Sequence, residues 1–145
     1  QLLAGPIERA KDLIPQFKRI PTFELEESKK AVLRILLGAF KKIVIANRLA
    51  LFVNEGYANP QELNGISAVF LIVFFVIQLY CDFSGYSDMA VGLARIFGII
   101  LPINFLSPLR SVNIAKFWRR WHITLSDFIK NYLYFPASLK LALKR

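Results

Sequence analysis

Three residue types that often build reactive sites are scarce in this chain: it contains one cysteine, one histidine and one methionine among 145 residues. The lone cysteine, Cys81, excludes an internal disulfide and a metal site made of cysteines. We expect Cys81 to pack as a small apolar side chain, and we expect no bound metal. The single histidine, His122, stands within a cluster of arginine and tryptophan.

Positive charge is absent from the middle of the chain. The 46 residues from Leu49 to Ala94 contain no Lys or Arg, whereas ten precede them and nine follow them. Because cytoplasmic loops of membrane proteins are enriched in Lys and Arg, this gap predicts a hairpin that crosses a membrane and returns. Its tip, residues 54–65, is rich in turn formers and predicts an external loop. Both basic flanks would then be cytoplasmic.

The remaining composition indicates a membrane protein. Hydrophobic residues make up 55% of the chain, with 13 phenylalanines, and charged residues 20%. The net charge of +9 could attract nucleic acid, but the basic residues lie beside long apolar runs. This placement favours membrane lipids as partners and argues against nucleic acid. The chain opens on Gln1 without a signal-peptide pattern, so we expect an internal fragment of a longer polytopic protein.

We predict an all-α fold, with transmembrane helices and amphipathic helices at the membrane interface. Residues 1–28 hold several prolines and mixed charge, and predict a cytoplasmic loop. Residues 29–53 predict an amphipathic or membrane helix, on which Arg34, Lys41 and Arg48 recur every seven residues as a basic stripe. Three charges facing lipid would cost several kcal/mol. This helix therefore lies along the cytoplasmic surface or turns the stripe toward protein or water.

The strongest candidate for a membrane span is the apolar run Ile66–Cys81. Sixteen helical residues cover about 24 Å, less than the roughly 30 Å of a bilayer core. The helix is therefore expected to continue into the polar stretch that follows, DFSGYSD. Membrane helices are predicted over residues 66–101, around this stretch.

The DFSGYSD box places Asp82, Ser84, Tyr86 and Asp88 directly after the apolar run. Ionisable groups at membrane depth are rare and usually functional, so these four residues are candidates for a supporting role along a substrate path. The structural alternative is that Asp82 or Ser84 caps the next helix while Gly85 relieves a kink. The two interpretations are compatible.

Residues 110–136 predict an amphipathic helix. Its apolar face would carry Ile114, Phe117, Trp118, Trp121, Leu125, Phe128 and Tyr132. His122 lies at the edge of this face. Tryptophan beside arginine is typical of a helix at a membrane interface, where Arg119 and Arg120 would contact lipid headgroups or the phosphate of a carrier. His122 then either packs as part of an anchor or carries chemistry.

Three blocks of this sequence resemble the membrane-bound O-acyltransferase family. In family order they are QLLAGPIERA (Gln1–Ala10), YCDFSGYSDMAVG (Tyr80–Gly92) and FWRRWHITLSDFIKNYLYFP (Phe117–Pro136). The likeness is to the bacterial branch that contains the membrane components of alginate O-acetylation and teichoic acid D-alanylation. It covers essentially the whole chain.

The resemblance implies a multi-pass enzyme of the inner (plasma) membrane. Such an enzyme moves an acyl group, usually acetyl, from a cytoplasmic thioester to a hydroxyl of an extracytoplasmic polysaccharide or partner protein. The acyl donor would be an acyl-CoA or an acyl carrier protein, no cofactor would be tightly bound, and an extracytoplasmic acyltransferase partner protein is expected. His122 matches the family's histidine in the WRRWH block, and a second catalytic histidine is expected beyond Arg145.

The chemistry of acyl transfer explains a catalytic histidine at this position. A base must remove the proton of the attacking hydroxyl, and imidazole titrates near neutral pH. Burial would favour the neutral, proton-accepting form of His122. The oxyanion formed on the thioester carbonyl needs donors, and the nearest in sequence are Arg119, Arg120 and Trp121.

Two other functions fit the same residues. A transport or channel subunit would line a polar pathway with Asp82, Asp88 and the basic stripe. A noncatalytic scaffold would use its basic amphipathic helices to hold the membrane. A second histidine in a tryptophan-rich segment beyond Arg145 would favour the acyltransferase.

Overall fold

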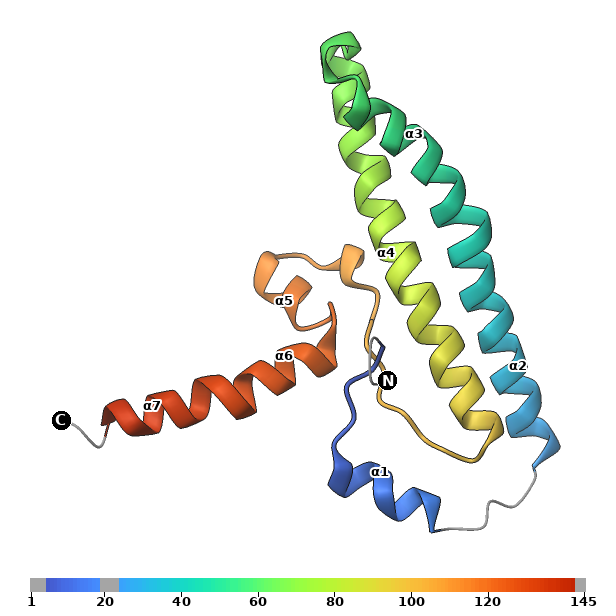
Figure 1. Cartoon of the computed structure of the whole chain (residues 1–145), viewed down its shortest axis with the longest axis vertical. Helices are drawn as coiled ribbons and strands as arrows, with labels where there is room; N and C mark the ends of the chain where they lie inside the picture. Colours follow the sequence, from blue (N-terminus) through green and yellow to red (C-terminus); the bar gives the residue numbers. More distant parts are fainter. Residues whose placement is uncertain (1–4, 19–23, 143–145) are drawn as a thin grey trace. The chain divides into compact units, whose positions relative to one another are not determined.

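The computed structural model describes residues 5–18 and 24–142. Every regular element in these ranges is helical, which confirms the predicted all-α class (Figure 1). The first four residues of the block Gln1–Ala10, and residues 19–23 of the predicted loop, lie outside the described ranges. The elements are α1 (Ala10–Phe17), α2 (Leu25–Ala39), η1 (Phe40–Ala46), α3 (Asn47–Ala58), η2 (Pro60–Glu62), α4 (Gly65–Ile96), η3 (Pro108–Arg110), α5 (Ile114–Trp118), α6 (Ile123–Ile129), η4 (Lys130–Tyr134) and α7 (Phe135–Ala142).

The chain divides into two compact units. One is Phe23–Ile96, which contains the helices from α2 to α4. The other combines Gln1–Thr22 with Phe97–Arg145, and contains α1 and the helices from η3 to α7. Within the predicted loop 1–28, the described residues therefore include the short helix α1 and the start of α2.

In the unit Phe23–Ile96, α2, η1 and α3 form one arm that runs antiparallel to α4 (Figure 1). Glycines let the two backbones approach closely. A Cβ atom at Gly38 would lie 2.6 Å from the carbonyl oxygen of Gly85, and one at Gly85 would lie 2.6 Å from that of Gly38. At Gly92 a Cβ would lie 2.8 Å from the carbonyl oxygen of Ala31. Small residues at such contacts are typical of helix pairs in membranes.

The π-helix η1 decides which side chains of the arm face α4. The buried positions on the arm are Ala31, Gly38, Ala46 and Val53. The step across η1 is thus one residue longer than the seven-residue steps on either side, because a π-helix bonds i to i+5. As a consequence Arg48 is exposed, and Lys42 joins Arg34 and Lys41 in facing α4. Of the predicted alternatives for the stripe, Arg34 and Lys41 turn toward protein, and Arg48 does not.

Helix α4 is continuous over 32 residues, about 48 Å at 1.5 Å per residue. It is the one helix in the described ranges that is long and apolar enough to cross a membrane. The DFSGYSD box lies inside it, so the alternative in which Asp82 or Ser84 caps a new helix is wrong, and Gly85 serves helix packing. The helix ends at Ile96, short of the predicted residue 101, and Gly98 follows with a left-handed φ of 73°.

The turn between α3 and α4 is shorter than the predicted loop of residues 54–65. Helix α3 continues to Ala58, and α4 begins at Gly65. Asn64 caps α4, because its Oδ1 accepts the backbone N–H of Ser67 at 2.8 Å. The connecting segment is therefore residues 59–64.

In the other unit, the predicted helix over residues 110–136 is divided. Helix α5 ends at Trp118, and a turn at residues 119–122 separates it from α6. From there α6, η4 and α7 follow without interruption to Ala142, past Pro136. The π-helix η4 directly precedes α7 and changes the hydrogen-bond pattern where the proline supplies no N–H. The residues of the predicted single apolar face are consequently divided among α5, the turn that follows it, α6 and η4.

Candidate active site

His122 is the N-cap of α6 and adopts the left-handed backbone conformation, with φ 43° and ψ 58°. This conformation costs roughly 1–2 kcal/mol for a residue with a Cβ atom, and such strain clusters at functional sites. The carbonyl oxygen of His122 accepts the N–H groups of Leu125 and Ser126, each at 3.1 Å. Its ring Nδ1 also accepts the N–H of Leu125, at 3.4 Å. The prediction that His122 lies inside a helix is therefore wrong, because it begins one.

An irregular segment before η3 holds the backbone on both sides of His122. The N–H of Leu106 donates to the carbonyl oxygen of Arg120 at 3.0 Å, and the N–H of Ile123 donates to that of Asn104 at 3.0 Å. These bonds take the place of helical ones, which explains the break in the predicted helix. The two attachment points leave a two-residue bridge that contains His122.

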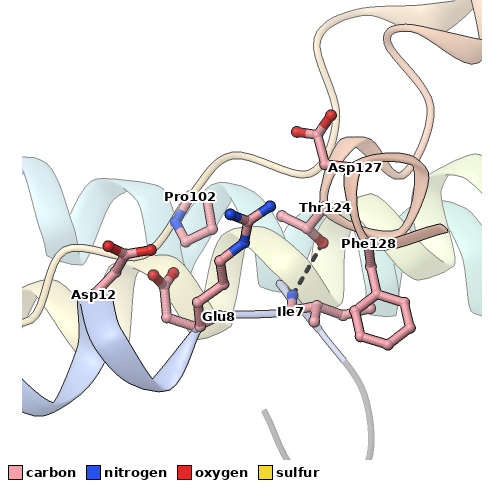
Figure 2. Close-up of a pocket in the computed structure, with 8 residues that line it drawn as sticks. Ile7, Glu8, Asp12, Pro102, Thr124, Asp127 and Phe128 are labelled. Atoms are coloured by element: carbon pink, nitrogen blue, oxygen red, sulfur yellow. Dashed lines mark hydrogen bonds between the residues drawn. The ribbon is translucent and has the colours of Figure 1, made fainter. Parts of the chain in front are cut away.

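Thr124 connects this segment to the N-terminal part of the same unit (Figure 2). Its hydroxyl donates to Oδ1 of Asn104 at 2.6 Å and accepts the N–H of Ile7 at 2.9 Å. The N–H of Thr124 lies 3.3 Å from the same Oδ1. Asn104 is 1% exposed and Thr124 8% exposed, so losing either side chain would leave a buried polar group without its partner. The sequence analysis selected neither residue.

The imidazole of His122 lies near Phe105, which belongs to a small group of aromatic side chains. The ring centroids of Phe105 and His122 are 6.4 Å apart. Trp121 meets Phe105 edge-on at 5.1 Å and stacks on Phe117 at 5.5 Å. Burial lowers the pKa of His122 below its ordinary value, which favours the neutral form of the ring.

The two arginines before Trp121 differ in their surroundings. Arg119 is exposed, whereas Arg120 is partly buried and its carbonyl oxygen binds Leu106. Arg120 therefore has a structural role through its backbone. Contact of the two guanidinium groups with phosphate, or with an oxyanion, stays a prediction.

A cavity of about 190 Å³ lies beside α6 (Figure 2). It is lined by Ile7, Glu8, Arg9, Asp12, Pro102, Thr124, Asp127 and Phe128. Glu8, Asp12 and Asp127 are the only acidic residues in the sequence of this unit. Burial, with the nearby carboxylate of Asp12, raises the pKa of Glu8. Within the described ranges no group of His, Cys, Asp or Glu is placed to hold a metal ion. Asp127 is the single acid in the sequence of residues 95–145, and this was the available sequence signal for the cavity.

The aspartates of the DFSGYSD box lie on α4, in the unit Phe23–Ile96. The carboxylate of Asp88 accepts hydrogen bonds from Nε of Arg34, at 3.0 Å, and from Nζ of Lys41, at 2.7 Å. Asp82 pairs with Lys42. The two aspartates therefore fasten α2 and η1 to α4. Their predicted supporting role at an active site or along a substrate path stays a prediction.

The other two predicted residues of the box differ in exposure. Ser84 is 1% exposed, and its hydroxyl has no hydrogen-bond partner in the described part of the chain. Tyr86 is 40% exposed. Ser84 thus contributes a small side chain to the contact with the arm, and a place for either residue on a substrate path stays a prediction.

Comparison with known proteins identifies close sequence relatives. The model of the MBOAT, membrane-bound O-acyltransferase family, matches residues 1–145. The peptidoglycan O-acetyltransferase of Helicobacter pylori is 46% identical over 138 residues, which cover 94% of this chain and 26% of that protein. The probable alginate O-acetylase AlgI of Pseudomonas putida is 41% identical over 133 residues, which cover 92% of this chain and 27% of that protein.

A more distant relative is the teichoic acid D-alanyltransferase of Streptococcus thermophilus. It is 30% identical over 137 residues, which cover 90% of this chain and 33% of that protein. The chain therefore spans about a quarter to a third of the length of these relatives.

Proposed function

The chain belongs to the membrane-bound O-acyltransferase family, and on that premise we propose that it forms part of an enzyme that transfers an acyl group to a hydroxyl. The relatives are named for acetyl transfer to peptidoglycan or alginate and for D-alanyl transfer to teichoic acid. For this chain we propose a cytoplasmic thioester, an acyl-CoA or acyl carrier protein, as the donor. The acceptor would be a hydroxyl of an extracytoplasmic polysaccharide or partner protein.

The observation that carries this proposal is the strained, hydrogen-bonded turn at His122. In the reaction the acceptor oxygen forms a bond to the thioester carbonyl carbon. The carbon–sulfur bond then breaks, and the proton of the hydroxyl leaves with the thiol. The developing oxyanion and the moving proton both need a positioned group. A neutral imidazole held at a fixed turn supplies one.

We propose a tautomer for His122 from the capping contact. Nδ1 lies 3.4 Å from the backbone nitrogen of Leu125, and a neutral ring that accepts this N–H carries its proton on Nε2. In this form Nε2 donates a hydrogen bond, which suits an oxyanion or the oxygen of a bound hydroxyl. Proton abstraction would then fall to a second histidine of the full-length protein.

The membrane setting follows from the same family. Helix α4 is the candidate span in the described ranges, and we propose a multi-pass protein of the inner membrane. Trp118 and Arg119 are exposed on α5 and its following turn, a pairing suited to lipid headgroups. An extracytoplasmic acyltransferase that receives or relays the acyl group is the proposed partner.

The ion pairs on α4 count against the transport alternative. A polar pathway lined by Asp82 and Asp88 requires carboxylates that are open to the transported solute. Instead, Asp88 is neutralised by Arg34 and Lys41, and Asp82 by Lys42.

Substitutions of His122 in the full-length protein test the proposal. Transfer of radiolabelled acetyl from acetyl-CoA would be measured in inverted membrane vesicles that contain the native acceptor. Asn tolerates the left-handed conformation and caps helices, so His122→Asn should keep wild-type abundance and thermal stability while losing about 10²-fold to 10⁴-fold in rate. His122→Ala should lose a similar rate and also the cap.

His122→Gln separates the two chemical roles. Its amide can donate a hydrogen bond near the position of Nε2 but is no effective base, so partial activity supports donation and complete loss supports proton transfer. A well-folded His122→Asn protein that turns over at close to the wild-type rate would show that His122 is a packing residue.

A further inference from the structure

Asn104 is a fully buried polar residue whose oxygen atoms bind residues beside His122, while its Nδ2 has no hydrogen-bond partner in the described part of the chain. Its main-chain carbonyl binds Ile123, and its side-chain Oδ1 binds both the N–H and the hydroxyl of Thr124. Burying an amide is unfavourable unless such bonds are formed. An apolar residue would fill this position at lower cost, so the polar side chain calls for a reason.

The direction of the hydrogen bonds explains why an acceptor oxygen is needed at this position. The Thr124 hydroxyl has one proton, and it accepts the N–H of Ile7, so that proton goes to Asn104. Oδ1 must therefore be an acceptor that faces two donors. A leucine at this position would leave the N–H and the hydroxyl of Thr124 buried without a partner.

These bonds constrain the backbone conformation of His122. A left-handed residue with a side chain persists where its surroundings determine the backbone. The residues directly after His122 are held by Asn104, and Arg120 is held by Leu106. Without the side chain of Asn104, Ile123 keeps its main-chain bond, but the N–H and the hydroxyl of Thr124 lose their acceptor. The backbone at His122 is then held less firmly.

We propose that Asn104 is a positioning residue for acyl transfer, which acts by locking Ile123 and Thr124 so that His122 keeps the turn from which its imidazole works. This inference rests on the proposed function of His122. It assigns Asn104 no contact with the substrate. Its effect should therefore appear only in an enzyme that still has His122.

The first test compares two variants of similar volume in the full-length enzyme. Asn104→Leu removes the acceptor, and Asn104→Asp keeps it. Because small misplacements of a catalytic group cost about 10²-fold, Asn104→Leu should lower kcat by about that factor with little change in KM for acetyl-CoA. Asn104→Asp should stay within about tenfold of wild type. Equal losses in both variants, or a loss confined to KM, would overturn the inference.

The second test asks whether Asn104 acts through His122. Single-turnover acetyl transfer would be measured for Asn104→Leu, His122→Asn and the double variant. If Asn104 only positions His122, adding Asn104→Leu to His122→Asn should change the remaining rate by less than about twofold. Multiplied losses in the double variant would show that Asn104 supports the fold in general, and the inference would be wrong.

Thr124→Val provides a variant in which Asn104 itself is unchanged. It removes the hydroxyl but keeps the backbone N–H that faces Oδ1, and its rate loss should be smaller and should also vanish beside His122→Asn. It replaces Asn104→Leu in both tests if that protein does not accumulate.

The two proposals fail differently. Wild-type turnover by His122→Asn would contradict the proposed function itself. Loss of turnover by His122→Asn together with a wild-type kcat for Asn104→Leu would remove only the role of Asn104.

Discussion

Lys41 and Asp88 form a close ion pair between η1 and α4, with Nζ of Lys41 lying 2.7 Å from the carboxylate of Asp88. Arg34 binds the other carboxylate oxygen at 3.0 Å, and the side chain of Asp88 is 20% exposed. Removing the acid leaves two cations that face each other without a counter-charge. We expect Asp88→Asn to lower the stability of the full-length protein by about 2 kcal/mol, between the values for exposed and buried pairs. The thermal unfolding midpoint in detergent measures this loss.

Asp82→Asn is the matched control for that prediction. The side chain of Asp82 is 46% exposed and pairs with Lys42 alone. The expected loss of stability is below about 1 kcal/mol, and acyl transfer should be retained. A larger loss for Asp82→Asn than for Asp88→Asn would contradict the importance that we assign to burial. Loss of turnover in a well-folded Asp82→Asn protein, as complete as for His122→Asn, would give Asp82 a catalytic role.

The close contact of α4 with its arm predicts sensitivity to a single methyl group. Gly38→Ala or Gly85→Ala would place a Cβ atom 2.6 Å from a backbone oxygen of the facing helix. The helices must then separate, and we expect a loss of about 1–3 kcal/mol. Gly65→Ala is the control, because its Cβ would meet no atom within 4 Å. Unchanged melting temperatures for Gly38→Ala and Gly85→Ala would show that these helices are not packed as described.

The charge gap predicts that the connection between α3 and α4 lies outside the cytoplasm. Because α3 extends to Ala58, the test belongs at the exposed Gln61 rather than at the end of the helix. In a Cys81→Ala background, Gln61→Cys should react with an impermeant thiol reagent in intact cells. Glu24→Cys, on the basic flank, should react only after the membrane is opened. The reverse pattern would invert the proposed orientation.

The raised pKa of Glu8 predicts a stability that depends on pH. Burial first, and then the carboxylate of Asp12, disfavour the ionised form in the folded protein. The folded state therefore holds the Glu8 proton at pH values where the unfolded state has released it, and stability falls as pH rises through this window. Glu8→Gln should raise the melting temperature at pH 7, and the gain should vanish below pH 4, where both states are protonated. A gain that is equal at both pH values would exclude this origin.

The sequence by itself determined the family, the helical class and the segment that carries His122. These properties depend on local information: the apolar run before Asp82, the absence of basic residues over 49–94, and the side chains of the WRRWH block. A long apolar run between basic flanks has few stable arrangements other than a membrane helix, so its interpretation does not require knowledge of distant contacts.

The tertiary structure decided the features that depend on residues distant in sequence. Helical periodicity placed His122 inside one helix. The carbonyl oxygen of Asn104 accepts the N–H of Ile123, and the N–H of Leu106 donates to Arg120, so the helix breaks there and His122 is held in a left-handed turn. A seven-residue repeat included Arg48 in the basic stripe, but the π-helix η1 turns Arg48 outward and brings Lys42 to α4. In both cases a backbone group or a charged side chain finds its partner on a segment distant in sequence, and that gain exceeds the local preference for an unbroken α-helix.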